Sequence, residues 1–469
     1  MSPKPSLARR ASIELRTYIM HRLFLGNFDF EHRLADPVRQ LPAKLERINA
    51  ELASSWLAIA NDGDYLWTPQ PIEAGFFEQA VRDGLPRVIP VVSLDDVPRE
   101  VECIPWGWTD DVRRLCDKHG WLHNDPPHEA VRAANSRRFS AALEREWLCG
   151  LDFAGEATSL QEIERLITFH DPESRWVVKA EFGMSGRERI LGCGSLTKAN
   201  RNWIEKRLAS DGVVFFEPWV KRQAEVGIQI NIPREGEPEL IAFVGMRVDE
   251  RGQYAGSHFA PRERKGSTSM VSGWRNMTGI ALRTAKRLQS VGYFGPLGID
   301  AMQYRAADGL VRWRPLQDIN ARWTMGRLSL GLRRLLQQRD VGFWRHGSQG
   351  PAESAFEMFR EFVRAEGLGL TPGHECVAQA VLASRQPFEA RDYFARIQRV
   401  AGGPHVSLTS VHWTLGLLEE AGFVRPIASA APRVLYEVRQ FPEKWRTIRT
   451  SPEMVGGSAA HHQSWVLVY

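Results

Sequence analysis

Cysteine is scarce in this sequence, and long hydrophobic runs are missing. Its 469 residues include five cysteines, and no two of them form a Cys-x-x-Cys pair. An odd number in this arrangement argues against a disulfide framework or a cysteine-rich zinc site, and fits a reducing compartment. No apolar stretch reaches the roughly 18 residues that a membrane helix needs. Charged residues interrupt the N-terminal segment, so no export signal is predicted. We therefore expect a soluble, cytoplasmic protein with no membrane partner.

The sequence also lacks a strong charge bias. Lysine and arginine number 61 against 56 acidic residues, which gives a formal net charge of +5. With 43% hydrophobic and 25% charged residues, the composition is that of a globular protein and excludes disorder and collagen. A mild positive excess suits anionic ligands but does not require nucleic acid. At about 150 residues per domain, the length predicts about three domains.

Changes in pattern divide the chain into three parts. Residues 1–130 mix helical and strand signals, and the breaker Asp125-Pro-Pro127 lies near their end. Residues 131–345 alternate apolar strands with amphipathic helices and contain hairpin signals, which predicts an α+β fold. Residues 346–469 show three short helical patterns, then two short strands and a Gly/Ser-rich tail. We predict an N-terminal α/β domain, a central α+β domain and a C-terminal helical domain with a small sheet.

Polar side chains gather where two consecutive predicted strands of the central part would pair. Asp318, Asn320 and Arg322 alternate along the second strand, so their side chains share a face. Asp300 lies on the first strand. One such residue would merely end a strand in a turn, but three at alternate positions favour a site. Oxygen donors of this kind suit Mg²⁺, and a guanidinium can hold a phosphoryl group.

Two weaker patterns precede this one. A predicted strand ends at Lys179 and leads into Gly183-Met-Ser-Gly186, where glycines would let backbone amides approach phosphate oxygens. The same pattern also fits an ordinary hairpin turn. A later strand ends at Glu217 and is followed by Val220 and Glu225, which could meet a base and a ribose. Taken singly, these residues are also typical of a strand end and a surface acid.

In this order, the three patterns resemble the ATP-grasp superfamily over about residues 134–335. The resemblance implies two α+β subdomains that clasp ATP, preceded by an α/β domain. It implies that Lys179 and Arg322 act catalytically on the transferred phosphate. The residues it implies for one or two Mg²⁺ ions are Asp300, Asp318 and Asn320. The residues it implies for the nucleotide are Arg137, Lys179, Gly183, Ser185, Gly186, Glu217, Val220 and Glu225.

Two departures from the family accompany this resemblance. The family usually has glutamate where Asp318 stands, and lysine near the position of Arg137. The activity implied is that of an ADP-forming ligase, which joins a carboxylate to an amine, of amino-acid or small-peptide type, through an acyl phosphate. Asp318 in place of glutamate keeps open the alternative of an ATP-binding protein without catalysis.

The segment from Leu368 to Val438 looks like the winged-helix domain of the ferric-uptake-regulator family. Ser407 is a candidate cap of its third helix, and Gly422 follows the end of that helix. Where that family has a Tyr-Arg pair on the recognition helix, this chain has His412-Trp413. Loss of the arginine removes a phosphate or base contact. A nucleotide-sensing regulator that binds DNA is therefore the alternative that the sequence favours less.

Overall fold

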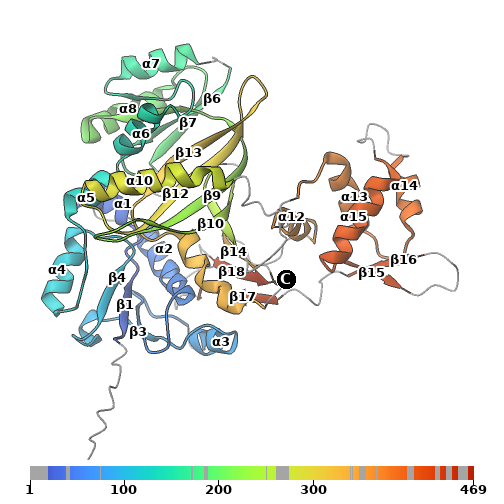
Figure 1. Ribbon diagram of the computed structural model, residues 1–469, viewed down its shortest axis with the longest axis horizontal. Coiled ribbons are helices and arrows are strands. Elements are labelled where there is room, and N and C mark those ends of the chain that lie inside the picture. The colour runs from blue at the N-terminus through green and yellow to red at the C-terminus, as the bar shows by residue number, and fades with distance from the viewer. Residues whose placement is uncertain are drawn as a thin grey trace, which may run out of the picture.

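The computed structural model describes residues 20–38, 43–73, 75–170, 173–183, 188–249, 251–259, 274–337, 340, 342–347, 355–365, 368–398, 406–427, 434–439, 446–452 and 463–468. Figure 1 shows a large body and a smaller lobe at the C-terminal side, joined through the region of α12 (Ala355–Ala365). The mixture of helices with parallel and antiparallel sheets agrees with the α+β class predicted from the sequence.

The N-terminal part is built on a parallel sheet of four strands in the order β3-β2-β1-β4. The strands are β1 (Arg22–Leu25), β2 (Tyr65–Trp67), β3 (Ile89–Val91) and β4 (Glu102–Pro105). The helices of this part are α1 (Phe30–Ala35), α2 (Ala43–Ala53), α3 (Phe76–Arg82) and α4 (Asp110–His119), with short 3-10 turns at Ser54–Ala58 and Leu94–Asp96. Parallel strands need such crossovers, so this part has the predicted α/β character.

A small antiparallel sheet with strand order β5-β8-β6-β7 follows two connecting helices, α5 (His128–Asn135) and α6 (Arg137–Trp147). Its strands are β5 (Gly155–Ala157), β6 (Arg175–Ala180), β7 (Arg189–Cys193) and β8 (Val214–Pro218). Its helices are α7 (Leu160–Phe169) and α8 (Lys198–Asp211), and Trp176, Val178 and Phe216 pack with them in a core of its own. Because strand side chains alternate, Lys179 and Glu217 project from the opposite face.

The largest sheet is antiparallel, with the order β13-β12-β9-β10-β11-β14-β18-β17. Its strands are β9 (Lys221–Ile232), β10 (Glu239–Val248), β11 (Tyr254–Phe259), β12 (Gly295–Arg305), β13 (Val311–Asn320), β14 (Gly342–Gly347), β17 (Arg446–Arg449) and β18 (Gln463–Val468). Helix α10 (Thr278–Ser290) packs against β9, β10 and β13. The remaining elements are α11 (Met325–Ser329) and 3-10 turns at Arg275–Met277 and Gly331–Leu335. Strands β9 and β10 pair antiparallel, and the predicted pairing of β12 with β13 is confirmed.

One hydrophobic core joins this sheet to the N-terminal part. It runs from Phe24 and Trp56 to Ile228, Ile299 and Trp344 without a break. A shared core of this kind holds the two parts in one body.

The C-terminal lobe contains α13 (Pro372–Leu382), α14 (Ala390–Gln398), α15 (Leu408–Glu420), β15 (Val424–Ile427) and β16 (Leu435–Val438). With α12 it has a core of its own, which includes Phe359, Val377, Leu418 and Phe423. The order of three helices and two antiparallel strands is the one that the sequence predicts. Ser407 accepts a hydrogen bond from Ser410 N and caps α15, and Gly422 follows that helix with a φ of 80°.

The end of the chain differs from the expectation of one C-terminal unit over residues 346–469. Strands β17 and β18 return to the large sheet, where β18 pairs with β14. Ile448, Val466 and Val468 enter the main core, and the Trp344 indole donates to Thr450 Oγ1 at 2.9 Å. The Gly/Ser-rich tail predicted at Gly456–Ala460 lies outside the described residues.

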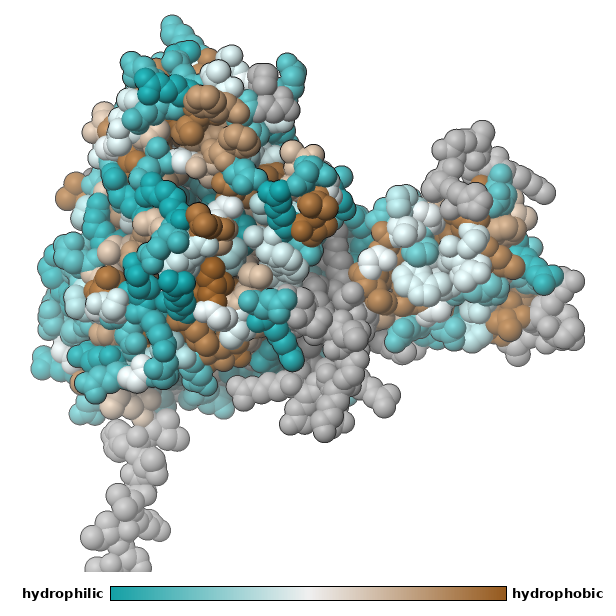
Figure 2. All heavy atoms as spheres, turned by 45° about the horizontal axis from the view of Figure 1, so that its top comes forward, coloured by the Kyte–Doolittle hydropathy of each residue, from teal (hydrophilic) through white to brown (hydrophobic). Residues whose placement is uncertain are grey.

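Within the described part of the chain, no helix is long and apolar enough to cross a bilayer. On the face shown in Figure 2, hydrophobic residues form small groups among hydrophilic ones rather than one broad apolar surface.

Candidate functional site

The acidic residues of β12 and β13 face each other across the hairpin. The strand register places Asp300 opposite Asp318, and Gly298 opposite Asn320. Asn320 Nδ2 donates to Asp300 Oδ2 at 3.3 Å. Burial, together with the charges of Asp318 and Glu225, raises the pKa of Asp300 to about 7. A nearby cation would favour the ionised form of Asp300, so this end of the hairpin suits a positive ligand.

The guanidinium of Arg322 is already engaged by the protein. It donates to Glu31 Oε1 at 2.5 Å, to Asn320 Oδ1 at 2.9 Å and to the carbonyl of Trp323 at 2.8 Å. It also lies over the ring of Trp106, 5.2 Å from the centroid. Arg322 is therefore fixed beside Asn320, and the amide oxygen of Asn320 faces this guanidinium. A metal bond to that oxygen would require the amide to rotate.

Lys179 and Glu217 form an ion pair on the face of the small sheet that its helices do not cover. Lys179 Nζ lies 2.7 Å from Glu217 Oε2, and both side chains are nearly buried. Burial lowers the pKa of Lys179, an effect that the carboxylate of Glu217 opposes. Burial would raise the pKa of Glu217, but the charges of Arg314 and Lys179 outweigh it and hold that pKa well below its usual range. The Glu217 side chain is thus held by cations of the protein, whereas the family resemblance implies a contact with the nucleotide.

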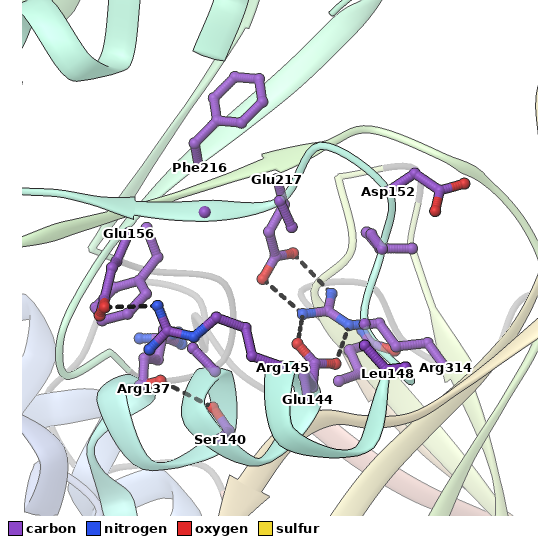
Figure 3. A pocket seen from close by; sticks show the side chains of 17 residues that line it. Arg137, Ser140, Glu144, Arg145, Leu148, Asp152, Glu156, Phe216, Glu217 and Arg314 are labelled. Atoms are coloured by element: carbon purple, nitrogen blue, oxygen red, sulfur yellow. Dashed lines mark hydrogen bonds and ion pairs between the residues drawn. The ribbon is translucent and has the colours of Figure 1, made fainter.

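Arg314, on β13, joins two carboxylates in forked geometry. It donates to both oxygens of Glu144, at 2.6 and 2.9 Å, and to both oxygens of Glu217, at 2.9 and 3.0 Å. Figure 3 shows Glu144 rising from α6 on one side of the guanidinium and Glu217 descending from β8 on the other. Arg314 and Glu144 were not predictable from the sequence. They lie 170 positions apart, and neither stands in a motif.

Arg137 connects α6 with both sheets. Its Nη1 donates to the carbonyl of Ala180 at 2.8 Å, and its Nη2 lies 3.4 Å from Asp318 Oδ2. Ser136 caps α6 and donates to Glu181 Oε1. The structure therefore brings Arg137, Lys179 and Asp318 into one neighbourhood, since the charges of Arg137 and Asp318 also act on the pKa of Lys179.

The other predicted nucleotide residues have different surroundings. Glu225, on β9, is buried and pairs with Arg222 at 3.1 Å, and burial raises its pKa. Val220 is partly buried against the small cluster that contains Met302 and Tyr304. Gly183 follows β6 on the chain, whereas Ser185 and Gly186 lie outside the described residues.

A pocket of about 290 Å³ lies beside this network. Arg137, Glu144, Phe215, Glu217, Arg314 and Gln317 are among the residues that line it. Figure 3 shows α6 along one side of the pocket and the Arg145–Glu156 pair at one end. Gln317 reaches the pocket because the β13 register shifts between Asp318 and Arg314, and such a bulge re-aims side chains. The Oε1 atom of Gln317 is buried, with no hydrogen-bond partner among the described residues.

No family model matches the sequence, and no curated protein matches it significantly. Solved structures with some similarity include the following three. N5-carboxyaminoimidazole synthetase from Staphylococcus aureus with ADP is 9% identical, with a TM-score of 0.39, over 70% of this chain and 82% of that one. Biotin carboxylase from Campylobacter jejuni with a β,γ-ATP compound is 10% identical, with a TM-score of 0.41, over 71% of this chain and 77% of that one. Carboxyaminoimidazole ribonucleotide synthase from Aspergillus clavatus with ATP is 12% identical, with a TM-score of 0.36, over 86% of this chain and 97% of that one. At TM-scores below 0.5, these likenesses do not assign the chain to a family, and the case for its function rests on the geometry of the site.

Proposed function

We propose that this protein is an ATP- and Mg²⁺-dependent ligase of the ATP-grasp type, which joins a carboxylate to an amine and releases ADP and phosphate. The observation that carries the proposal is the juxtaposition of two opposed carboxylates with two cations from other elements. Asp300 and Asp318 face each other on β12 and β13, while Arg137 and Lys179 approach from α6 and β6. Oxygen donors beside fixed positive charges are what a triphosphate with its cation requires.

The donor set fits Mg²⁺ better than a metal held by protein alone. Among the described residues, no group of three or more His, Cys, Asp or Glu side chains could hold a metal ion. Mg²⁺ needs only one or two carboxylates, because waters and substrate phosphates supply its other ligands. Asp300 and Asp318 would hold it, with Asn320 at its side. When bound, the ion would offset negative charge on the phosphate oxygens.

The residues of the chain would act by binding and orienting the reactants. Lys179 and Arg137 would bind phosphate oxygens, and the ion pair with Glu217 favours the charged form of Lys179 and fixes its side chain in place. An oxygen of the substrate carboxylate attacks the γ-phosphorus, and ADP leaves with the bond electrons. The amine then attacks the carbonyl carbon of the acyl phosphate, loses a proton and expels phosphate. The small sheet would cover this intermediate and exclude water.

The test is a screen of amino acids and small peptides for ADP formation that depends on Mg²⁺ and on both substrates. Asp318→Asn should reduce turnover by at least about 100-fold because it removes a charged ligand. The matched control is Asp308→Asn, in the turn of the same hairpin, where Asp308 pairs with Arg312. This control should keep full turnover. An Asp318→Asn variant as active as the wild type would contradict the metal assignment, whereas Mg·ATP binding without turnover by any substrate pair would favour the non-catalytic alternative.

The alternative of a DNA-binding regulator finds little support in α15, the recognition-helix position. This helix contains no lysine or arginine and ends in Glu419 and Glu420. Trp413 is partly exposed and its ring lies 4.3 Å from that of His374. Since phosphate neutralisation dominates DNA affinity, such a helix is poorly suited to the duplex. A gel-shift titration at low salt that showed specific binding would revive this alternative.

A further inference from the structure

Glu31 reaches from the N-terminal part of the protein to Arg322, 291 positions further along the chain. We propose that Glu31 is a positioning residue, which fixes the guanidinium of Arg322 so that it can contact the terminal phosphate of ATP. The proposal rests on the proposed function and names a residue that no motif in the sequence indicates.

The sheet topology explains how Glu31 comes to this place. β1 and β4 are neighbouring parallel strands, so the loops after them leave from the same edge. Asn27, after β1, accepts from Trp106 N at 2.9 Å and donates to the carbonyl of Gly107 at 2.8 Å, which ties the two loops together. Helix α1 starts just beyond, and its second residue is Glu31. Glu31 therefore lies beyond the carboxyl ends of β1 and β4, the edge at which parallel sheets often bind ligands, and there it meets Arg322 just after β13.

The contact is buried on both sides. Glu31 is 5% exposed, and the side chain of Arg322 is 9% exposed. An arginine has five N–H groups. At least three of these on Arg322 are directed to Glu31, Asn320 and the Trp323 carbonyl. The orientation of this guanidinium is therefore set before any phosphate arrives.

The second oxygen of Glu31 indicates that stability alone does not account for this residue. Oε2 is buried and has no hydrogen-bond partner among the described residues. An unsatisfied buried oxygen is a cost to the fold, and such exceptions call for an explanation. A role in holding Arg322 explains why a carboxylate stands here despite this cost. A carboxylate both accepts a hydrogen bond from the guanidinium and balances its positive charge.

The same contact extends toward the proposed metal residues. Arg322 donates to Asn320 Oδ1, and Asn320 Nδ2 donates to Asp300 Oδ2. Three consecutive contacts therefore link Glu31 with the hairpin that would hold Mg²⁺. Groups that orient such side chains typically matter about 10- to 100-fold for affinity or activity.

The test compares binding of Mg·AMP-PNP, which has a terminal phosphate, with binding of Mg·ADP, which lacks it, by isothermal titration calorimetry. Glu31→Gln should weaken Mg·AMP-PNP binding about 10-fold or more and leave Mg·ADP binding nearly unchanged. The double variant with Arg322→Ala should bind no more weakly than Arg322→Ala alone, because residues that act as a unit are not additive.

Asp29→Asn is the matched control. It removes a carboxylate from the start of the same helix, where Asp29 bonds to Arg33 and Asn49 and does not touch Arg322. It should bind both nucleotides like the wild type. If Glu31→Gln does not fold, as judged by circular dichroism, Glu31→Asp replaces it, because the shorter arm keeps the charge but loses the reach to Arg322.

Equal affinity of wild type and Glu31→Gln for Mg·AMP-PNP would overturn the inference, as would additive losses in the double variant. Equal weakening of both nucleotides would also overturn it, because that result indicates a general structural role. A wild-type protein that binds neither nucleotide would instead refute the proposed function, and this inference with it.

Discussion

The buried group of Arg314 with Glu144 and Glu217 gives the sharpest prediction. We consider the substitution Arg314→Leu. The side chain of Arg314 is 4% exposed, and those of Glu144 and Glu217 are 8% and 12% exposed. Removing the arginine leaves two carboxylates in the protein interior, with Lys179 as the nearest remaining cation of the network. Breaking a buried ion pair by removing one partner costs about 3–5 kcal/mol. We expect a decrease of that size in the free energy of unfolding at pH 7.

The pH dependence follows from the same contacts. In the native protein, Arg314 and Lys179 hold the pKa of Glu217 well below its ordinary value. A carboxylate with a lowered pKa contributes stability that is present above its unfolded pKa and lost as the pH falls through the folded value. Without Arg314, Glu144 and Glu217 should both bind protons more readily. The difference in stability between wild type and variant should therefore shrink as the pH falls from 7 toward about 4, where free glutamate titrates.

Urea unfolding followed by far-UV circular dichroism, at pH 7 and at pH 4.5, measures both effects. The matched control is Arg312→Leu, two positions earlier on β13, where Arg312 forms solvent-exposed pairs with Asp152 and Asp308. This control should leave the unfolding midpoint unchanged. A loss below about 1 kcal/mol for Arg314→Leu at pH 7, within the range of a surface pair, would refute the reasoning. A loss of equal size at both pH values would refute the assignment of its cause.

Three further predictions test the site, the fold and the reactivity of one partly buried thiol. Lys179→Met should weaken Mg·ATP binding about 10- to 100-fold in a calorimetric titration, while the contact of Glu217 with Arg314 keeps the protein folded; unchanged affinity would remove Lys179 from the site. Truncation after Gly347 should cause insolubility or loss of cooperative unfolding, because β17 and β18 are part of the large sheet; a cooperative, soluble fragment would show these strands to be dispensable. Burial and the charge of Glu144 raise the pKa of Cys149 to about 11, so iodoacetamide at pH 8 should label it more slowly than exposed Cys193; peptide mass spectrometry after timed labelling measures both rates.

The parts of the fold that were predictable from the sequence depend on short-range patterns. The pairing of β12 with β13 follows from two apolar strands joined by a short turn, and side-chain alternation then places Asp318 and Asn320 on one face. The turn alone would set Asp300 opposite Leu316. The register shift between Asp300 and Met302 brings Asp300 opposite Asp318 instead, and the sequence did not indicate that shift. Helices α13 and α15 of the C-terminal lobe were predictable for a similar reason, since each begins at a capping residue, Thr371 and Ser407.

The contacts that escaped prediction join distant segments. Glu144 and Arg314 lie on α6 and β13, and Glu31 and Arg322 are separated by most of the chain. None of these residues stands in a local pattern, because an ion pair leaves no periodic trace in the sequence. The bulge before Asp318 adds a second obstacle, since it shifts the alternation that would otherwise indicate which face Gln317 occupies. Strands β17 and β18 were missed because their partner, β14, precedes the whole C-terminal lobe.

The division of hydrophobic cores bears on how the site would work. The N-terminal part and the large sheet share one core, so Glu31, Arg322 and the β12–β13 hairpin belong to a single rigid body. The small sheet has a separate core with α7 and α8. Its contacts with the rest of the protein at the site include the polar pairs of Arg137 with the Ala180 carbonyl and of Arg314 with Glu217. When such a contact opens, both partners regain water, unlike a substitution that leaves one charged partner buried. A shared apolar core has no such compensation on opening. Under the proposed function, the element that carries Lys179 would therefore be the one that moves toward the nucleotide, while the two opposed aspartates would stay in place.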